Sequence, residues 1–149
     1  MKSLWGKLGV ILLIIFFFVV GCQTPVKKDE YSKGADWKYF ASTESFFVYY
    51  DTQTITRLSK NIVRVWVRYS YTKKGVLYHM WNFGEKYENL SYSICLMEID
   101  CVEKMYRTLL KTEYDNKGIA ISSSTNFPLE RQIIPPESVF ELLYNAVCK

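Results

Sequence analysis

One histidine and four cysteines are the side chains of this sequence best suited to act as nucleophiles or metal ligands. A Ser-His-Asp or Cys-His arrangement would have to use His79, which lies in an aromatic stretch, residues 77–81. We favour a structural or surface histidine there. The sequence contains no Cys-x-x-Cys motif and no four-ligand zinc spacing. It therefore predicts no catalytic residue, no metal site and no cofactor.

Two carboxylates, Glu98 and Asp100, alternate onto one face of an expected strand. Their spacing of about 6.6–7 Å along the strand overlaps the carboxylate separation of inverting glycosidases. A solvated strand face is the favoured interpretation of such a pair. The sequence also has no phosphate-binding loop and no dinucleotide fingerprint. These observations argue against an enzyme.

Cys22 is the cysteine with the clearest chemistry, because it follows a short apolar run at residues 8–20. The run begins after Lys2 and Lys7 and is shorter than the roughly 20 residues that span a bilayer, but it suits a signal peptide. Its end, Val-Val-Gly-Cys at residues 19–22, resembles the lipobox of bacterial lipoproteins. That resemblance implies a diacylglyceryl group on the Cys22 thiol, cleavage before Cys22 and acylation of the new amine. The alternative is an ordinary secreted cysteine after a plain signal peptide.

These features divide the chain into a lipoprotein signal peptide (1–21), a flexible tether (22–35) and a folded domain (36–149). The tether is predicted because residues 24–34 are polar and charged without periodicity. Two or more acyl chains hold a protein stably at a membrane. Gln23 stands where enterobacterial inner-membrane lipoproteins carry Asp. We therefore expect a cell-envelope protein anchored at the outer membrane, with the lipid on Cys22 contacting the membrane.

Charge and composition narrow the function further. The net charge of +4 falls to about +2 once Lys2 and Lys7 are removed, which gives no electrostatic case for binding nucleic acid. All twelve tyrosines lie in the mature part, which is also rich in β-branched residues. Both residue classes favour strands.

The pattern predicts an α+β fold, an antiparallel sheet of about six strands with a C-terminal α-helix packed across one face. The clearest strand is residues 61–71, where Val63, Val65 and Val67 alternate with polar or larger side chains. Residues 136–147 have the apolar spacing of an amphipathic helix. Residues 72–90 are expected to form a long loop, with room for a helical turn within it. The other expected strands are 37–43, 46–50, 91–100, 105–114 and 119–123.

Three cysteines remain in the mature domain, Cys95, Cys101 and Cys148. Export places them in an oxidising compartment, where one disulfide and one free thiol are expected. We favour a Cys101–Cys148 disulfide, because Cys101 ends a strand and can reach the end of the helix. Cys95 then behaves as a small buried hydrophobic residue.

The order of short motifs resembles the surface-adhesin protein E family of bacterial lipoproteins, over about residues 36–149. That resemblance implies an antiparallel sheet with a C-terminal helix fixed to it, a disulfide at Cys101 and Cys148, and adhesion to host proteins. It assigns no binding residues here, and Cys95 departs from the family pattern. The matching pieces are Trp37, Phe47-Val48-Tyr49-Tyr50-Asp51, Val65-Trp66-Val67, Met97-Glu98-Ile99-Asp100-Cys101, Tyr106-Arg107, Tyr114-Asp115-Asn116-Lys117-Gly118, Ile134-Pro135-Pro136 and Val147-Cys148.

Arg64, Trp66 and Arg68 form the candidate binding face, on the side of strand 61–71 away from the valines. Arg and Trp are frequent hot spots of protein interfaces. We favour a structural role, in which Trp66 packs under residues 72–90 and the arginines cover it. A face for an external or envelope protein, or a homodimer contact, is the alternative.

Two functional classes follow from these features. A non-enzymatic binding module for external proteins predicts an exposed aromatic and basic patch without a polar pocket. A periplasm-facing structural or small-ligand-binding lipoprotein is the alternative, and its ligand-binding form predicts a concave pocket with polar groups around His79 or Glu98.

Overall fold

The computed structural model describes residues 34–149. The predicted signal peptide, the lipid site at Cys22 and most of the predicted tether lie outside the described residues. None of the helices within residues 34–149 is long and apolar enough to cross a membrane.

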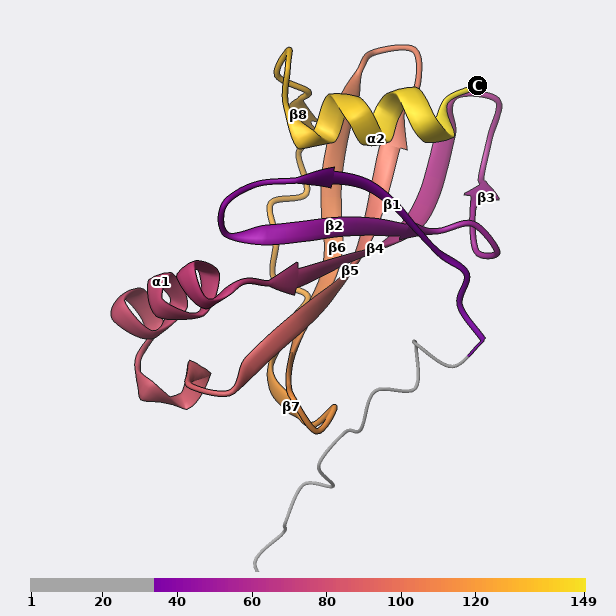
Figure 1. Cartoon of the computed structure of the whole chain (residues 1–149). Coiled ribbons are helices and arrows are strands. Elements are labelled where there is room, and N and C mark those ends of the chain that lie inside the picture. The colour runs from indigo at the N-terminus through magenta and orange to yellow at the C-terminus, as the bar shows by residue number, and fades with distance from the viewer. Residues whose placement is uncertain (1–33) are drawn as a thin grey trace, which may run out of the picture.

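The described part of the chain is an α+β fold built on one antiparallel sheet, as the sequence predicts (Figure 1). Six strands follow one another across the sheet in the order β1-β2-β4-β5-β6-β7, while the short β3 pairs with β4 and the short β8 with β6. Their bounds are β1 Trp37–Ser42, β2 Phe46–Asp51, β3 Thr56–Arg57, β4 Ile62–Tyr71, β5 Leu90–Asp100, β6 Met105–Asp115, β7 Ala120–Ser124 and β8 Gln132–Ile133.

Strand β4 shows why the sheet has one apolar face. Val63, Val65 and Val67 are fully buried and pair with Ile99, Met97 and Cys95 of β5, whose side chains share that face. The intervening residues of β4 are only half-buried. Period-two alternation therefore puts the core on one side of the sheet, called the inner face below, and leaves the outer face on the other.

Helix α2 (Val139–Val147) lies across the inner face (Figure 1). It begins at Ser138, whose hydroxyl accepts a hydrogen bond from the Glu141 N–H at 3.2 Å, an N-cap that starts the helix. The start is three residues later than the sequence predicted, because Glu137 has a positive φ of 57°. Leu143 and Val147 join the buried core, whereas Leu142 of the same helix is half exposed.

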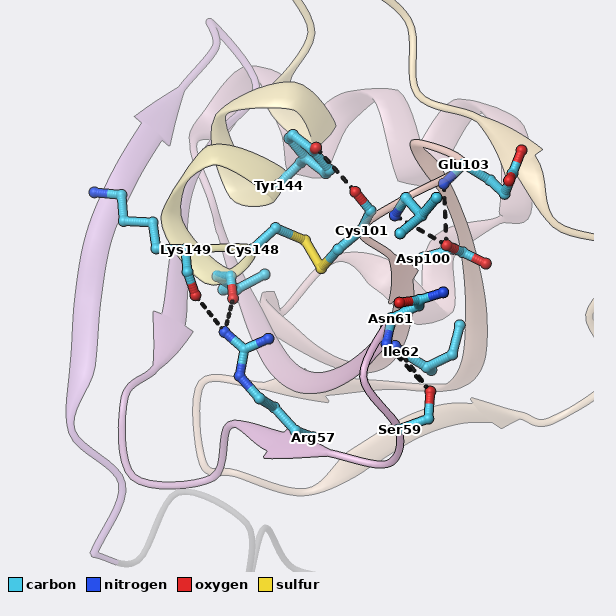
Figure 2. The surroundings of a disulfide bond; sticks show 12 residues. Arg57, Ser59, Asn61, Ile62, Asp100, Cys101, Glu103, Tyr144, Cys148 and Lys149 are labelled. Carbon is cyan, nitrogen blue, oxygen red and sulfur yellow. Dashed lines mark hydrogen bonds between the residues drawn. A yellow bond between two sulfur atoms is a disulfide. The ribbon is translucent and has the colours of Figure 1, made fainter.

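A disulfide joins Cys101, just after β5, to Cys148 at the end of α2 (Figure 2). The Tyr144 hydroxyl also donates a hydrogen bond to the Cys101 carbonyl at 3.0 Å. On the far side of the disulfide, Arg57 of β3 donates to the carbonyl of Lys149 at 2.5 Å. The end of the chain is therefore held to the sheet by a covalent bond and by hydrogen bonds. Cys95 is a free, buried cysteine.

The expectation of a long loop at residues 72–90 is wrong. The segment forms helix α1 (Lys73–Phe83) and a 3₁₀ turn, η3 (Glu85–Tyr87). Thr72 caps α1 by accepting from the Gly75 N–H, and Gly75 lies so close to the Ser45 carbonyl that an added Cβ would be 2.2 Å from the oxygen. Four large apolar side chains of α1 are exposed, so the helix lacks the apolar stripe by which sequence patterns reveal helices: Leu77, Tyr78, Trp81 and Phe83.

Candidate functional site

The three residues of the predicted binding face, Arg64, Trp66 and Arg68, all lie on the outer face of β4. The structure separates them by their neighbours. Arg64 pairs with Glu98 across β4 and β5, Trp66 pairs with Leu96, and Arg68 lies beside Tyr49 of β2. Residues 72–90 attach to the sheet through the inner face, where His79 of α1 lies against Tyr71.

Glu98 is the centre of a buried charge cluster that includes Arg64. Its carboxylate accepts from Arg64 at 3.1 Å, from Arg107 at 2.7 Å and from Arg131 at 3.1 Å. Arg131 also reaches Asp100 at 3.4 Å. The solvated face expected for Glu98 and Asp100 is therefore wrong, because Glu98 is only 2% exposed and Asp100 is also buried. Ion pairs with the three guanidinium groups offset the free-energy cost of burying the charged carboxylate.

The same arrangement sets the chemistry of Glu98. Burial acts to raise its pKa, but the hydrogen bonds from Arg131, Arg64 and Arg107 outweigh it and hold the pKa below its ordinary value. A carboxylate that is charged at neutral pH and whose oxygens are held by three arginines is unsuited to transferring protons. This cluster is therefore a structural element of the outer face.

Beside the cluster, towards the β1 edge, the outer face carries aromatic side chains. Trp37 and Tyr39 of β1 share this face with Tyr49 and Phe47 of β2, which pair with Arg68 and Ser70 of β4. Tyr39 is 52% exposed and Phe47 is 45% exposed. Tyr39 and Tyr49 meet edge to face, with ring centroids 5.8 Å apart. We call this set the edge patch: Trp37, Tyr39, Phe47, Tyr49, Arg68 and Ser70.

The edge patch contains a pocket of about 240 Å³, lined by Trp37, Tyr49, Arg68 and Ser70. Two of these residues carry a buried N–H group, Trp37 Nε1 and Arg68 Nε, without a hydrogen-bond partner among the residues that the structure describes, as do Arg64 Nε and Arg131 Nε outside the pocket. The Arg68 guanidinium lies over the Tyr92 ring, 4.2 Å from its centroid. Within residues 34–149, Arg68 forms no ion pair, in contrast to Arg64.

A second pocket, of about 290 Å³, opens on the inner face and draws residues from both helices. Aromatic rings form most of its wall, and polar groups lie at one end. The Tyr71 hydroxyl and the Ser93 hydroxyl are hydrogen-bonded at 3.0 Å. Its lining residues are Phe46, Tyr69, Tyr71, His79, Ser93, Cys95, Thr108, Lys111, Phe127 and Phe140.

Glu113 connects the polar end of this inner pocket to the helices. It accepts from Lys111 at 2.6 Å and from the Tyr87 hydroxyl at 2.9 Å, and its carboxylate lies 3.6 Å from His79 Nε2. His79 Nδ1 is 2.9 Å from the Gly75 carbonyl oxygen. Because a carbonyl only accepts, Nδ1 must carry the proton, and His79 Nε2 faces Glu113. His79 thus links α1 to the sheet, as expected for a structural histidine.

Cys95 borders the inner pocket but is chemically quiet. Burial is the main cause that raises its pKa to about 12, so the sulfur stays a thiol at neutral pH. The described residues contain no group of three or more His, Cys, Asp or Glu side chains placed to hold a metal ion.

Four aromatic members of the edge patch, Trp37, Tyr39, Phe47 and Tyr49, were not identified as site residues from the sequence. They are spaced two apart within their strands, so the signal for a shared face was present. The sequence did not show that β4 lies between β2 and β5, so it did not reveal that residues of β2 lie beside Arg68.

The family model described as surface-adhesin protein E matches residues 37–149. That range covers every strand and helix of the structure. No curated protein and no solved structure matches the chain.

Proposed function

The chain belongs to the surface-adhesin protein E family, and from that premise we propose that its domain is a non-enzymatic binding module that attaches to an external protein. The proposal includes a lipid on Cys22 as the anchor to the outer membrane. Membership of an adhesin family favours a location at the cell surface and a role without catalysis.

The observation that carries this proposal is the edge patch. Tyr39 and Phe47 expose large aromatic surfaces on the same face as the cation Arg68, around Tyr49, which pairs with both Tyr39 and Arg68. Interfaces are enriched in aromatic residues and arginine, and a few such residues supply most of the binding free energy. The opposite face of the sheet is occupied by α2 and the core, so the outer face is the better binding surface.

The first experiment asks on which side of the outer membrane the domain lies. Intact cells expressing the tagged protein are treated with an external protease, with a periplasmic protein as the control. We expect the tag to be cleaved while the control survives. A tag that survives until the outer membrane is opened excludes adhesion.

The second experiment tests the edge patch. Cells carrying the double variant Tyr39→Ser/Phe47→Ser should adhere to monolayers of cultured animal cells at least tenfold less than cells carrying the unchanged protein, because aromatic hot spots contribute about 2 kcal/mol or more each. Trp81→Ser is the matched control, since Trp81 is 85% exposed on α1, outside the patch. Equal adhesion of the double variant and the control would contradict the proposal.

Small-ligand binding is a second candidate function, favoured by the inner pocket beside His79. Its volume of about 290 Å³ lies near the lower end of ligand pockets. A filling substitution, Thr108→Phe, should abolish any thermal stabilisation that a panel of small amphipathic molecules gives the protein. A panel without any stabilising compound would remove this candidate.

A homodimer through the outer face is a further proposal, to be tested by sedimentation of the purified protein.

A further inference from the structure

The two arginines on the outer face of β4 differ in their partners. Arg64 forms an ion pair with Glu98 at 3.1 Å, and Glu98 is shared with two further arginines. Arg68 has no acidic partner among residues 34–149 and instead lies over the Tyr92 ring. Such stacking fixes the plane of a guanidinium group and leaves its charge available. The edge patch therefore presents a positive charge that the described part of the domain does not balance.

Two of the residues that line the pocket next to Arg68 also carry N–H groups that lack acceptors. Trp37 Nε1 and Arg68 Nε are both buried without a hydrogen-bond partner among the described residues, and the two side chains that carry them line the same pocket. A buried donor without an acceptor is unfavourable, so an oxygen acceptor in the pocket would lower the free energy of the site. Ser70, on the same wall, offers a hydroxyl as a third donor.

From this geometry we propose that the pocket binds the side-chain carboxylate of an Asp or Glu residue in an acidic segment of the partner protein. A carboxylate has two oxygens for two N–H donors and one negative charge for one unpaired guanidinium. The pocket volume of about 240 Å³ suits a side chain. The exposed rings of Tyr39 and Phe47 would then contact the residues on either side of the acidic residue. This inference rests on the proposed function, because it names the feature by which the edge patch recognises its partner.

The test uses the purified, ¹⁵N-labelled full chain and a blocked pentapeptide with a central Glu between valines. The readout is the indole N–H resonance of Trp37, assigned with Trp37→Phe. We expect the Glu peptide to move this resonance downfield in a saturable manner, and added salt to weaken the effect. The matching peptide with Gln in place of Glu should leave it in place. No movement, or equal movement with the Gln peptide, overturns the proposal.

Two further arms identify the source of the carboxylate and the donor that holds it. Acetate that moves the resonance at the same concentration as the Glu peptide would show a small-anion site only and overturn the acidic segment. Arg68→Lys keeps the charge but removes the Nε–H, and should weaken the Glu peptide about tenfold. Arg131→Lys, which changes an arginine already paired with Glu98, should stay within twofold. Equal effects of the two variants would contradict the role of Arg68.

The outcomes separate this inference from the proposed function. Adhesion that depends on Tyr39 and Phe47, combined with an unresponsive Trp37 resonance, refutes the carboxylate pocket and leaves the adhesive role standing. A domain that is protected from external protease, combined with a Glu-specific shift, refutes adhesion and leaves the pocket standing.

Discussion

Glu98 is the buried charge on which the outer face is organised. Its carboxylate meets three guanidinium groups, and its removal would leave Arg64, Arg107 and Arg131 facing one another. We expect Glu98→Gln to lower the free energy of unfolding by about 3 kcal/mol at pH 7, near the lower end for breaking a buried pair because the arginines are partly exposed. Urea unfolding measures this change. Glu103→Gln, at an exposed position, should change it by no more than about 0.5 kcal/mol.

The same residue predicts a dependence of stability on pH. The pKa of Glu98 is lowered from its ordinary value of 4.5 in the folded protein. A lowered folded-state pKa gives stability that is present above the unfolded value and is lost as the pH falls through the folded value. The difference between the unchanged protein and Glu98→Gln should therefore narrow below about pH 4.5. A difference that stays constant down to pH 2 would show that Glu98 acts through its shape and not through its charge.

At the scale of elements, helix α1 depends on the glycine by which it approaches the turn before β2. Ala normally stabilises a helix interior by about 1 kcal/mol relative to Gly. At position 75 we expect the opposite sign, a loss of about 2 kcal/mol, because an added Cβ would be 2.2 Å from the Ser45 carbonyl oxygen and Ser45 or the helix would have to shift. Thermal or urea unfolding of Gly75→Ala checks the sign. Lys73→Ala, in the first turn of the same helix, is the matched control and should be close to neutral.

The disulfide is the second element-scale device, since it ties the end of α2 to the end of β5. Its cysteines are 47 residues apart, and closing such a loop contributes about 4 kcal/mol in the chain-entropy model. We expect reductant to lower the free energy of unfolding by about that amount. Cys148→Ser should start at the lower value and be insensitive to reductant. Cys95→Ala, which lacks only the free thiol, should lose as much on reduction as the unchanged protein.

Elements whose residues alternate between water and the core could be predicted from sequence, and the others could not. The alternation of Val63, Val65 and Val67 predicts β4, because burial of one face of a strand repeats every second residue. Helix α1 could not be predicted because it is held by Gly75 and His79, two contacts without periodicity. The turn at Glu137 that delays α2 is likewise a local backbone conformation with no pattern.

The candidate site was predicted only in part, for a related reason. Alternation placed Arg64 and Arg68 on one face, which is a local property of β4. Their different surroundings depend on neighbours in other strands, which are Glu98 for Arg64 and Tyr49 for Arg68. Strand order is set by contacts that are distant in sequence, and the sequence alone does not reveal them. Glu98 and Asp100 were expected in water for the same reason, because Arg131 reaches them from a segment 33 and 31 residues away.

At the scale of the whole molecule, the two faces of the sheet have different tasks. The inner face holds the core, α2 and the disulfide, and the burial there contributes to the stability of the domain. The outer face carries the Glu98 cluster and the edge patch. Trp37 opens the first strand and also lines the patch pocket, so the chain enters the domain beside its candidate binding site. A partner that binds there would lie close to Trp37, near the start of the described residues.

The proposed function requires the proposed anchor at Cys22. A domain released from the cell could bind a partner without holding the cell to it. We expect Cys22→Ser to abolish palmitate labelling. The variant should either leave the membrane pellet for the soluble fraction or keep its uncleaved signal peptide, since stable attachment by lipid needs two or more acyl chains. Cys95→Ser, which removes a thiol without touching the lipobox, should still be labelled and sediment with membranes. Adhesion should fall with labelling in Cys22→Ser cells even though the purified domain keeps its affinity for the Glu peptide. Palmitate labelling that persists in Cys22→Ser would place the lipid elsewhere and remove the basis of the proposed anchor.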